Sequence, residues 1–326
     1  MMRTTVAAAL AACLWLASGC ADRQESAPAG RPSGKLIVFH AGSLAVPFRE
    51  IVAGFKREYP EVKVICEAAG SRACARKIVD LNRACDVMAS ADYTVIDTLL
   101  IPDHAEWNIK FAGNEMAIAY RDGSRRADQM GQDNWYEILL KDDVAFGRSD
   151  PNADPCGYRA ALVVKLAEKH YKAAGLAERL LKKDLRYIRP KETDLLALLE
   201  TGTIDYVFLY RSVAEQHGLR RLVLPDEVNL KKSELGDWYA SVAVEISGKD
   251  PGSVITKRGE PMVYGVTIPT RAPNREAAIA FVAFLLSESK GMSIMARNGL
   301  PPLVPAPTDT FAEVPPPLKK FAAEPK

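Results

Sequence analysis

Three segments of the sequence place small polar residues where an apolar run ends and a helical pattern begins. They are Ala41-Gly42-Ser43, Ala69-Gly70-Ser71 and Asp154-Pro155-Cys156. A helix N-terminus carries unpaired backbone N–H groups and a partial positive charge, and a serine there adds a hydroxyl donor. Serine and aspartate are also ordinary helix caps, so capping explains any one segment by itself. The three together predict a site for an oxyanion.

Catalytic and metal-binding interpretations of the same residues have less support. Ser43 lies in Ala-Gly-Ser-Leu rather than in the G-x-S-x-G pattern of a nucleophile elbow. The four histidines are scattered and no C-x-x-C pair occurs, which disfavours a catalytic triad and a zinc site. Asp154 and Glu192 could act as a glycosidase pair, but few aromatic residues accompany them to stack on a sugar. A secreted hydrolase that uses Ser43 or these two acids is the alternative from another functional class.

The elements that must position these residues alternate between strands and helices. Apolar runs typical of buried strands occur at 35–40, 62–66 and 85–89, and helical patterns follow the first two. Another helix is predicted from Asp154 to about Lys172. This alternation predicts an α/β fold with mostly parallel sheets, in which ligands bind at the carboxyl ends of the strands. Further strands are predicted at 115–120, 144–148, 204–210, 222–224, 241–246 and 262–269, and a helix at 275–287.

The first twenty residues predict export across a membrane. An apolar run at 6–16 is too short to span a bilayer but fits a signal peptide. The ending Leu-Ala-Ser-Gly-Cys resembles a bacterial lipobox, so we expect removal of residues 1–19 and a lipid on Cys20. Plain cleavage near that position is the alternative. Residues 20–34 are polar and rich in Pro, Gly and Ser, which predicts a flexible tether.

The charge composition bears on possible binding partners, and the cysteine content bears on possible disulfides. The 326 residues include 43 Lys and Arg against 41 Asp and Glu, and this near-balance argues against a nucleic-acid-binding protein. After export, four cysteines remain in an oxidising compartment, where three full disulfide pairings or free buried thiols are the alternatives. These are Cys66, Cys74, Cys85 and Cys156.

The predicted site segments also carry a family resemblance. Between about residues 36 and 300, the sequence resembles the extracytoplasmic molybdate/tungstate-binding proteins of ABC transporters. The matching stretches are FHAGSLAVPF (39–48), EAAGSRACARKI (67–78), DVMASADY (86–93), NEMAIAYR (114–121), SDPNADPCGYRA (149–160), RPKETDLLALLETGTIDYVFLYRSVAEQHGL (189–219) and MVYGVTIP (262–269).

The resemblance implies a two-lobed periplasmic-binding-protein fold of type II, with an oxyanion held in the cleft between the lobes. Lobe I is expected to comprise residues 35–115 and about 236–310, and lobe II about 116–235, with a Pro-rich tail at 311–326. The implied ligand contacts are Gly42, Ser43 and Ser71 from lobe I and Asp154, Pro155, Cys156, Glu192 and Tyr210 from lobe II.

The resemblance also implies that the metal of the oxyanion is octahedral. Asp154 and Glu192 would each add one carboxylate oxygen to the four oxo groups, with Glu200 as the competing acid. Hard metal centres accept carboxylate oxygen, whereas the sulfur of sulfate does not expand to six oxygens and would meet only repulsion.

The expected function is therefore binding of molybdate or tungstate for uptake, without catalysis and without a cofactor. The expected partners are the oxyanion, an ABC-transporter permease and the membrane, which a lipid-anchored, periplasmic monomer would contact through its lipid. A sulfate- or phosphate-binding protein is the alternative within the same class.

Overall fold

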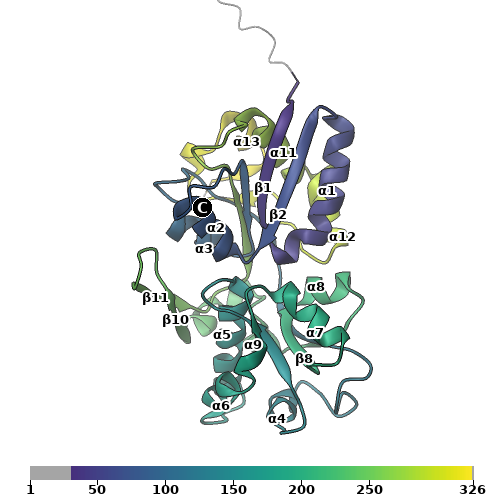
Figure 1. The fold of residues 1–326 in the computed structure, drawn as a ribbon. Helices are drawn as coiled ribbons and strands as arrows, with labels where there is room; N and C mark the ends of the chain where they lie inside the picture. The colour runs from purple at the N-terminus through teal and green to yellow at the C-terminus, as the bar shows by residue number, and fades with distance from the viewer. Residues whose placement is uncertain (1–30, 325–326) are drawn as a thin grey trace, which may run out of the picture. The chain divides into compact units, whose positions relative to one another are not determined.

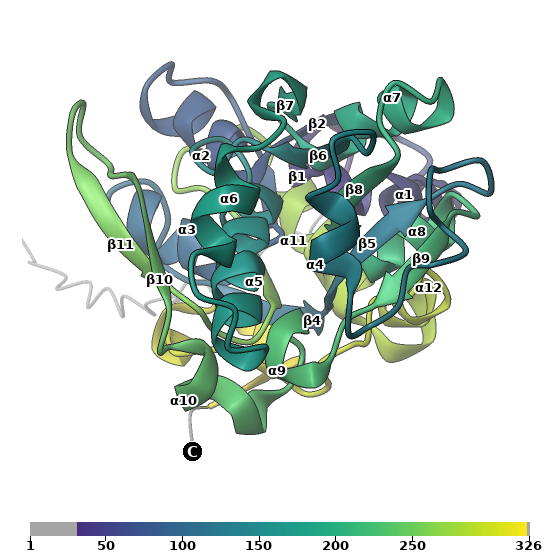
Figure 2. The same cartoon turned by 90° about the horizontal axis from the view of Figure 1, so that it is seen from below.

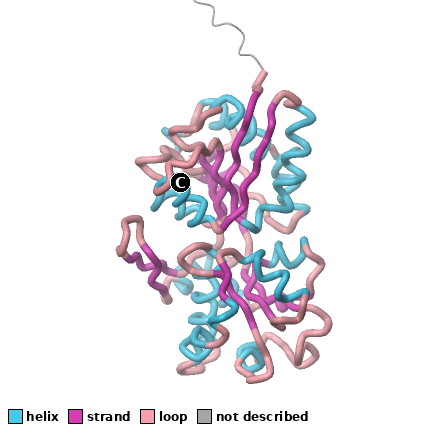
Figure 3. The backbone as a smooth tube through the Cα atoms, in the orientation of Figure 1, coloured by secondary structure: helices cyan, strands magenta, loops and turns pink. Residues whose placement is uncertain are grey.

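The computed structural model describes residues 31–324, and all its strands and helices lie in the unit that begins at Pro32. The predicted signal peptide, Cys20 and most of the predicted tether lie outside the described residues. Figure 3 shows the strands gathered in groups with helices beside them.

One five-stranded sheet has the order β2-β1-β3-β12-β4. Strand β1 pairs parallel with β2 and β3, and β12 pairs antiparallel with β3 and β4. The long strands β1 and β2 lie side by side in Figure 1. Its strands are β1 (Gly34–Ala41), β2 (Val62–Ala69), β3 (Val87–Ser90), β4 (Ile109–Gly113) and β12 (Val263–Thr267). The helical elements of this part are η1 (Gly42–Leu44), α1 (Ala45–Glu58), α2 (Ser71–Val79), α3 (Tyr93–Leu99), α11 (Arg275–Leu286), the π-helical turn η5 (Glu288–Met292) and α12 (Ser293–Arg297).

The other five-stranded sheet has the order β7-β6-β8-β5-β9. Strand β6 pairs parallel with β7 and β8, and β5 pairs antiparallel with β8 and β9. Its strands are β5 (Met116–Tyr120), β6 (Phe146–Ser149), β7 (Ile188–Arg189), β8 (Tyr206–Tyr210) and β9 (Arg220–Val223). The helical elements of this part are α4 (Trp135–Leu139), α5 (Pro155–His170), α6 (Leu176–Lys182), η2 (Leu185–Tyr187), η3 (Glu192–Leu195), α7 (Leu196–Glu200), α8 (Arg211–Gln216), α9 (Asp226–Asn229), η4 (Ser233–Leu235) and α10 (Gly236–Tyr239).

Two sheets with flanking helices confirm the expected α/β, two-lobed fold, but half of the strand pairings in each sheet are antiparallel. The antiparallel strands are β5 and β12. Each enters its sheet after the chain has come from the other sheet: only Asn114 and Glu115 separate β4 from β5. Such a strand does not follow a crossover helix within its own sheet, so the rule that makes βαβ neighbours parallel does not apply to it.

The second passage between the sheets contains an antiparallel hairpin of β10 (Ala243–Ser247) and β11 (Val254–Arg258), which Figure 2 shows as a separate ribbon. The sequence predicted its first strand but not its second. The predicted Pro-rich tail at 311–326 contains the short elements η6 (Phe311–Glu313), α13 (Pro316–Lys319) and β14 (Ala322–Ala323), and β13 (Ala306–Pro307), which lies just before the tail, pairs with β14.

The helical spacing of apolar residues correctly predicted the buried face of α1. Phe48, Ile51 and Phe55 are fully buried. The Phe55 ring lies 5.2 Å from the ring of Phe281 on α11, and the Phe48 ring lies 6.1 Å from it. Burial of side chains of this size contributes about 1.5–3 kcal/mol each, which fixes the helix that begins beside Ser43.

Two further observations concern the described residues only. Cys66, Cys74, Cys85 and Cys156 are free thiols. No single described helix is long and apolar enough to cross a membrane, and one bent pair, α11 with the segment Glu288–Arg297, meets that criterion by length and composition.

Candidate functional site

The centre of the candidate site is a pair of buried acids, Asp154 and Glu192. Asp154 caps α5, and its Oδ1 accepts a hydrogen bond from the N–H of Cys156 at 3.3 Å. Its Oδ2 accepts a second from the N–H of Glu192 at 3.0 Å. The Glu192 side chain is 1% exposed, and neither of its carboxylate oxygens has a hydrogen-bond partner. One acid is thus held by backbone donors, while the other is buried with its hydrogen-bonding capacity unused.

The electrostatics of this pair are unfavourable without a further partner. Burial raises the pKa of Asp154. Burial also raises the pKa of Glu192 well above its usual range, and the negative charge of Asp154 raises it further. An isolated buried carboxylate costs several kcal/mol unless it is neutralised, hydrogen-bonded or bound to a metal centre. The raised pKa means that Glu192 retains a proton to higher pH than an ordinary glutamate, and an electrophilic centre bound by both acids would take the place of that proton.

The turn after β1 packs directly on Glu192. A Cβ atom on Gly42 would lie 3.0 Å and 3.1 Å from the two carboxylate oxygens and 3.1 Å from Oγ1 of Thr193. Residues of the two sheets thus meet at the acid pair, with glycine allowing the close approach.

The turn after β2 meets the loop that precedes Asp154. A Cβ atom on Gly70 would lie 2.3 Å from the carbonyl oxygen of Ala153 and 3.0 Å from Cβ of Asp154. The N–H of Ala73, in the first turn of α2, donates a hydrogen bond to the same carbonyl at 3.1 Å. The glycines of both predicted Gly-Ser segments therefore contact the acid-bearing segments.

Both predicted serines are buried at this junction. Ser43 Oγ accepts a hydrogen bond from the hydroxyl of Tyr264 at 3.0 Å. Ser71 Oγ accepts one from the N–H of Ala91 at 2.9 Å. Ser43 has no hydrogen bond to a histidine among the described residues, and the ring of His40 bonds instead to the carbonyl of Ala41 at 2.8 Å.

The remaining predicted contact residues are Tyr210, Pro155 and Cys156. Tyr210 ends β8, is fully buried, and its hydroxyl accepts a hydrogen bond from Arg159 at 3.1 Å. Pro155 begins α5 and has no N–H to offer. The N–H of Cys156 is engaged by Asp154, and its thiol donates to the carbonyl of Phe208. The N–H of Cys156 thus helps to hold the Asp154 carboxylate in place. The competing acid Glu200 is exposed.

An ion-pair cluster beside the site was not found from the sequence. Asp92, which caps α3, lies 2.9 Å from Nζ of Lys257 and 3.7 Å from Nη2 of Arg159, and it accepts a hydrogen bond from the hydroxyl of Tyr158. Burial alone would raise the pKa of Asp92, but Lys257 and Arg159 outweigh it and lower the pKa. The only available signal was the presence of Asp92, Tyr158 and Arg159 within the DVMASADY and SDPNADPCGYRA stretches.

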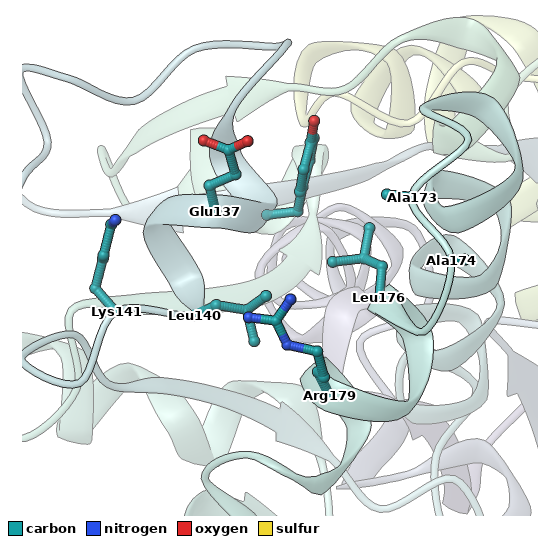
Figure 4. Close-up of a pocket in the computed structure, with 8 residues that line it drawn as sticks. Glu137, Leu140, Lys141, Ala173, Ala174, Leu176 and Arg179 are labelled. Carbon is teal, nitrogen blue, oxygen red and sulfur yellow. The ribbon is translucent and has the colours of Figure 1, made fainter.

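Neither a metal-ion cluster nor the pocket between α4 and α6 competes with the acid pair among the described residues. No group of three or more His, Cys, Asp and Glu side chains in residues 31–324 is arranged to hold a metal ion. A pocket of about 370 Å³ between α4 and α6 is lined by Glu137, Lys141 and Arg179 among others, and none of its lining residues belongs to the predicted site (Figure 4).

Comparison with known proteins places the chain in a family. Residues 36–300 match the family model described as bacterial extracellular solute-binding protein. A molybdate/tungstate-binding protein of Pyrococcus abyssi is 42% identical over 325 residues, which cover 91% of this chain and 92% of that protein. A solute-binding protein of Petrotoga mobilis is 50% identical over 290 residues, which cover 89% and 90%.

Solved structures agree on the fold. The periplasmic molybdate-binding protein of Azotobacter vinelandii superposes with a TM-score of 0.56 at 15% identity, covering 81% of this chain and 98% of that one. The sulfate-binding protein SubI of Mycobacterium tuberculosis has a TM-score of 0.61 at 13% identity, covering 82% and 87%. At such identities the likeness concerns the fold alone, whereas the family match and the sequence relatives confirm the resemblance inferred from the motifs. The chain belongs to the bacterial extracellular solute-binding protein family.

Proposed function

We propose that this protein captures molybdate or tungstate outside the cytoplasm and delivers it to an ABC-transporter permease. One observation carries the proposal: both carboxylate oxygens of Glu192 are buried and unpartnered beside Asp154. Relatives at 42% identity that are named molybdate/tungstate-binding proteins support the same ligand.

The acid pair would bind the metal of the oxyanion rather than its oxygens. Two carboxylates facing a dianion are repulsive unless each forms a bond to the central atom. Hexavalent molybdenum and tungsten are hard centres that accept carboxylate oxygen, so one oxygen each from Asp154 and Glu192 would complete an octahedron with the four oxo groups. The same pair would exclude sulfate, because its sulfur offers no such bond.

The oxo groups would be held by hydroxyl and backbone donors from both lobes. Ser43 and Ser71 are buried at the junction and have their oxygens already engaged as acceptors. Tyr210 lies close by, with its ring 6.3 Å from that of Tyr264. None of these donors carries a formal charge, which agrees with the nearly balanced composition of the chain.

Binding would draw the two lobes together, and the permease would recognise the closed form. We place the lobes at residues 35–115 with about 236–310, and at about 116–235. The hydrogen bond of Ala73 to Ala153 and the packing of Gly42 on Glu192 are contacts that such a closure would form. A lipid on Cys20 would keep the monomeric protein at the outer face of the membrane.

Calorimetric titration tests the ligand. We expect tight binding of molybdate and tungstate and no measurable binding of sulfate or phosphate. Sulfate binding within tenfold of molybdate would contradict the proposal. X-ray absorption at the tungsten edge tests the coordination: six oxygen neighbours are expected, and four would show that the carboxylates do not bind the metal.

Substitution of the acids tests which residues carry the site. Asp154→Ala removes one metal ligand and is expected to weaken binding at least a hundredfold, because a charged interaction in a buried site is lost and Glu192 remains unpaired. Glu200→Gln is the matched control, since Glu200 is exposed and its loss should leave affinity unchanged. Equal affinities of the two variants would refute the assignment.

A further inference from the structure

The hydrogen-bond partner of Ser43 belongs to a chain of polar groups that the sequence analysis did not single out. Tyr264 lies in β12 and is fully buried. Its hydroxyl is 3.0 Å from Ser43 Oγ and 3.0 Å from Nδ2 of Asn114. Asn114 is buried in the two-residue passage between β4 and β5, and its Nδ2 also donates to Ser212 Oγ at 2.7 Å. The chain therefore runs from a passage between the two sheets to the candidate ligand serine.

The orientation of the Asn114 amide follows from its other contact. Its Oδ1 accepts a hydrogen bond from the N–H of Glu115 at 2.9 Å, so its NH₂ group must face Ser212 and Tyr264. An amide nitrogen only donates. The hydroxyl oxygen of Tyr264 is therefore the acceptor of the Asn114 hydrogen bond.

The direction of the next bond is then determined. A phenol has one proton, and burial raises the pKa of Tyr264, so that the phenol keeps this proton. The buried phenol proton needs an acceptor, the Asn114 nitrogen cannot accept it, and Ser43 Oγ is the other hydrogen-bond partner of this hydroxyl among the described residues, so the proton is donated to Ser43 Oγ. Ser43 is an acceptor in this bond, and its own proton is available for a ligand.

The Ser71 hydroxyl also accepts a hydrogen bond, in this case from a group that can only donate. Its Oγ accepts from the backbone N–H of Ala91 at 2.9 Å, so its hydroxyl proton is also available. A backbone N–H has no alternative direction, whereas a tyrosine hydroxyl alone could turn and accept. The Asn114 amide removes that freedom from Tyr264.

We propose that Asn114 and Tyr264 are positioning residues that commit the Ser43 hydroxyl to donate its proton to the bound oxyanion. The inference rests on the proposed function, because it concerns how Ser43 meets that ligand. A site in which both serine hydroxyls can only donate hydrogen bonds to the ligand suits an oxyanion whose oxygens are all acceptors, such as molybdate. It disfavours an oxyanion that carries a proton of its own, since two donors would face each other.

A double-mutant cycle on the full chain tests the coupling, with molybdate as the titrant. Tyr264→Phe removes only the hydroxyl and should weaken binding roughly tenfold, as expected for misorientation of one hydrogen bond to a charged group. In a Ser43→Ala background the same change should alter affinity less than twofold, because its effect acts through the Ser43 hydroxyl. Tyr206→Phe is the matched control: Tyr206 is equally buried, and its hydroxyl bonds to the carbonyl of Arg125 away from the acids.

The outcomes separate this inference from the proposed function. If the unchanged chain binds neither molybdate nor tungstate, the proposed function fails and the inference fails with it. If the unchanged chain binds and the losses of Tyr264→Phe and Ser43→Ala add, the inference alone is overturned. A second cycle with Asn114→Ala and Ser43→Ala covers the case in which Tyr264→Phe does not fold. Its two losses should also be less than additive, and additivity there overturns the inference as well.

Discussion

Gly70→Ala should block closure of the lobes without disturbing the fold of either sheet. Gly70 precedes α2 with φ −58° and ψ 140°, a conformation that alanine adopts without strain. The added methyl carbon would lie 2.3 Å from the carbonyl oxygen of Ala153, whereas ordinary contact begins at about 3.4 Å. The clash is between backbone and Cβ, so no side chain can rotate to relieve it.

The geometry of this clash gives the expected loss of affinity in Gly70→Ala. The two segments must separate by 3.4 − 2.3 = 1.1 Å. The hydrogen bond from Ala73 to Ala153, now 3.1 Å, would lengthen by a similar amount and be lost. Loss of one such bond costs about 1 kcal/mol and overpacking adds about 1–3 kcal/mol, so the closed form loses about 2–4 kcal/mol. At about 1.4 kcal/mol per factor of ten, affinity falls roughly 30- to 700-fold.

Calorimetry with tungstate measures the affinity, and small-angle X-ray scattering measures compaction on binding. The free energy of unfolding of the ligand-free variant should be unchanged or higher by about 0.4–1 kcal/mol, since alanine reduces the freedom of the unfolded chain. Gly236→Ala is the control, because nothing lies within 4 Å of the added carbon. Tungstate affinity within threefold of the unchanged chain, with the same compaction, would refute the argument that this contact forms on closure.

Two further substitutions test the buried charged side chains at and beside the site. Glu192→Gln should abolish tungstate binding and change the pH dependence of ligand-free stability, measured by urea unfolding between about pH 5 and pH 8. Burial raises the pKa of Glu192 in the folded chain. The stability that Glu192 contributes is therefore fully present below its ordinary pKa and is lost as the pH rises through the raised pKa. Glutamine does not titrate, so the variant should not show this loss. Lys257→Met takes away the 2.9 Å partner of Asp92 and should weaken tungstate binding about tenfold, because Arg159 alone then faces a buried carboxylate. Lys249→Met, which removes an ion pair between partly exposed side chains, should leave affinity within twofold.

The expectations that succeeded rest on local patterns. The helical stripe of α1 and the capping of α5 by Asp154 were correctly predicted, because periodicity and caps depend on neighbouring residues. The short strands β4 and β11 were missed. β11 is exposed along much of its length and contains Lys257 and Arg258, so it lacks the apolar run by which buried strands are recognised.

The sheet directions could not be predicted from local pattern either. Alternating strands and helices indicated parallel pairing, but β5 and β12 arrive from the other sheet and pair antiparallel. The direction of a strand depends on how the chain enters the sheet. A strand reached through a crossover helix of its own sheet runs parallel to its neighbour, whereas β5 and β12 enter from the other sheet and run antiparallel. No local pattern in the sequence indicated the direction of the strands that follow these passages.

The sequence by itself determined which segments could hold an oxyanion, since glycine, serine and an acid at helix starts are properties of adjacent residues. Only the tertiary structure decided that Gly42 packs on Glu192 and that Gly70 meets Ala153. It also decided that Tyr264, 221 positions from Ser43, sets the direction of that serine's hydrogen bond. The two glycine contacts join segments that belong to different sheets, and the Ser43–Tyr264 bond joins two distant segments of one sheet. Their distances depend on how the whole chain packs, and no local pattern encodes that packing.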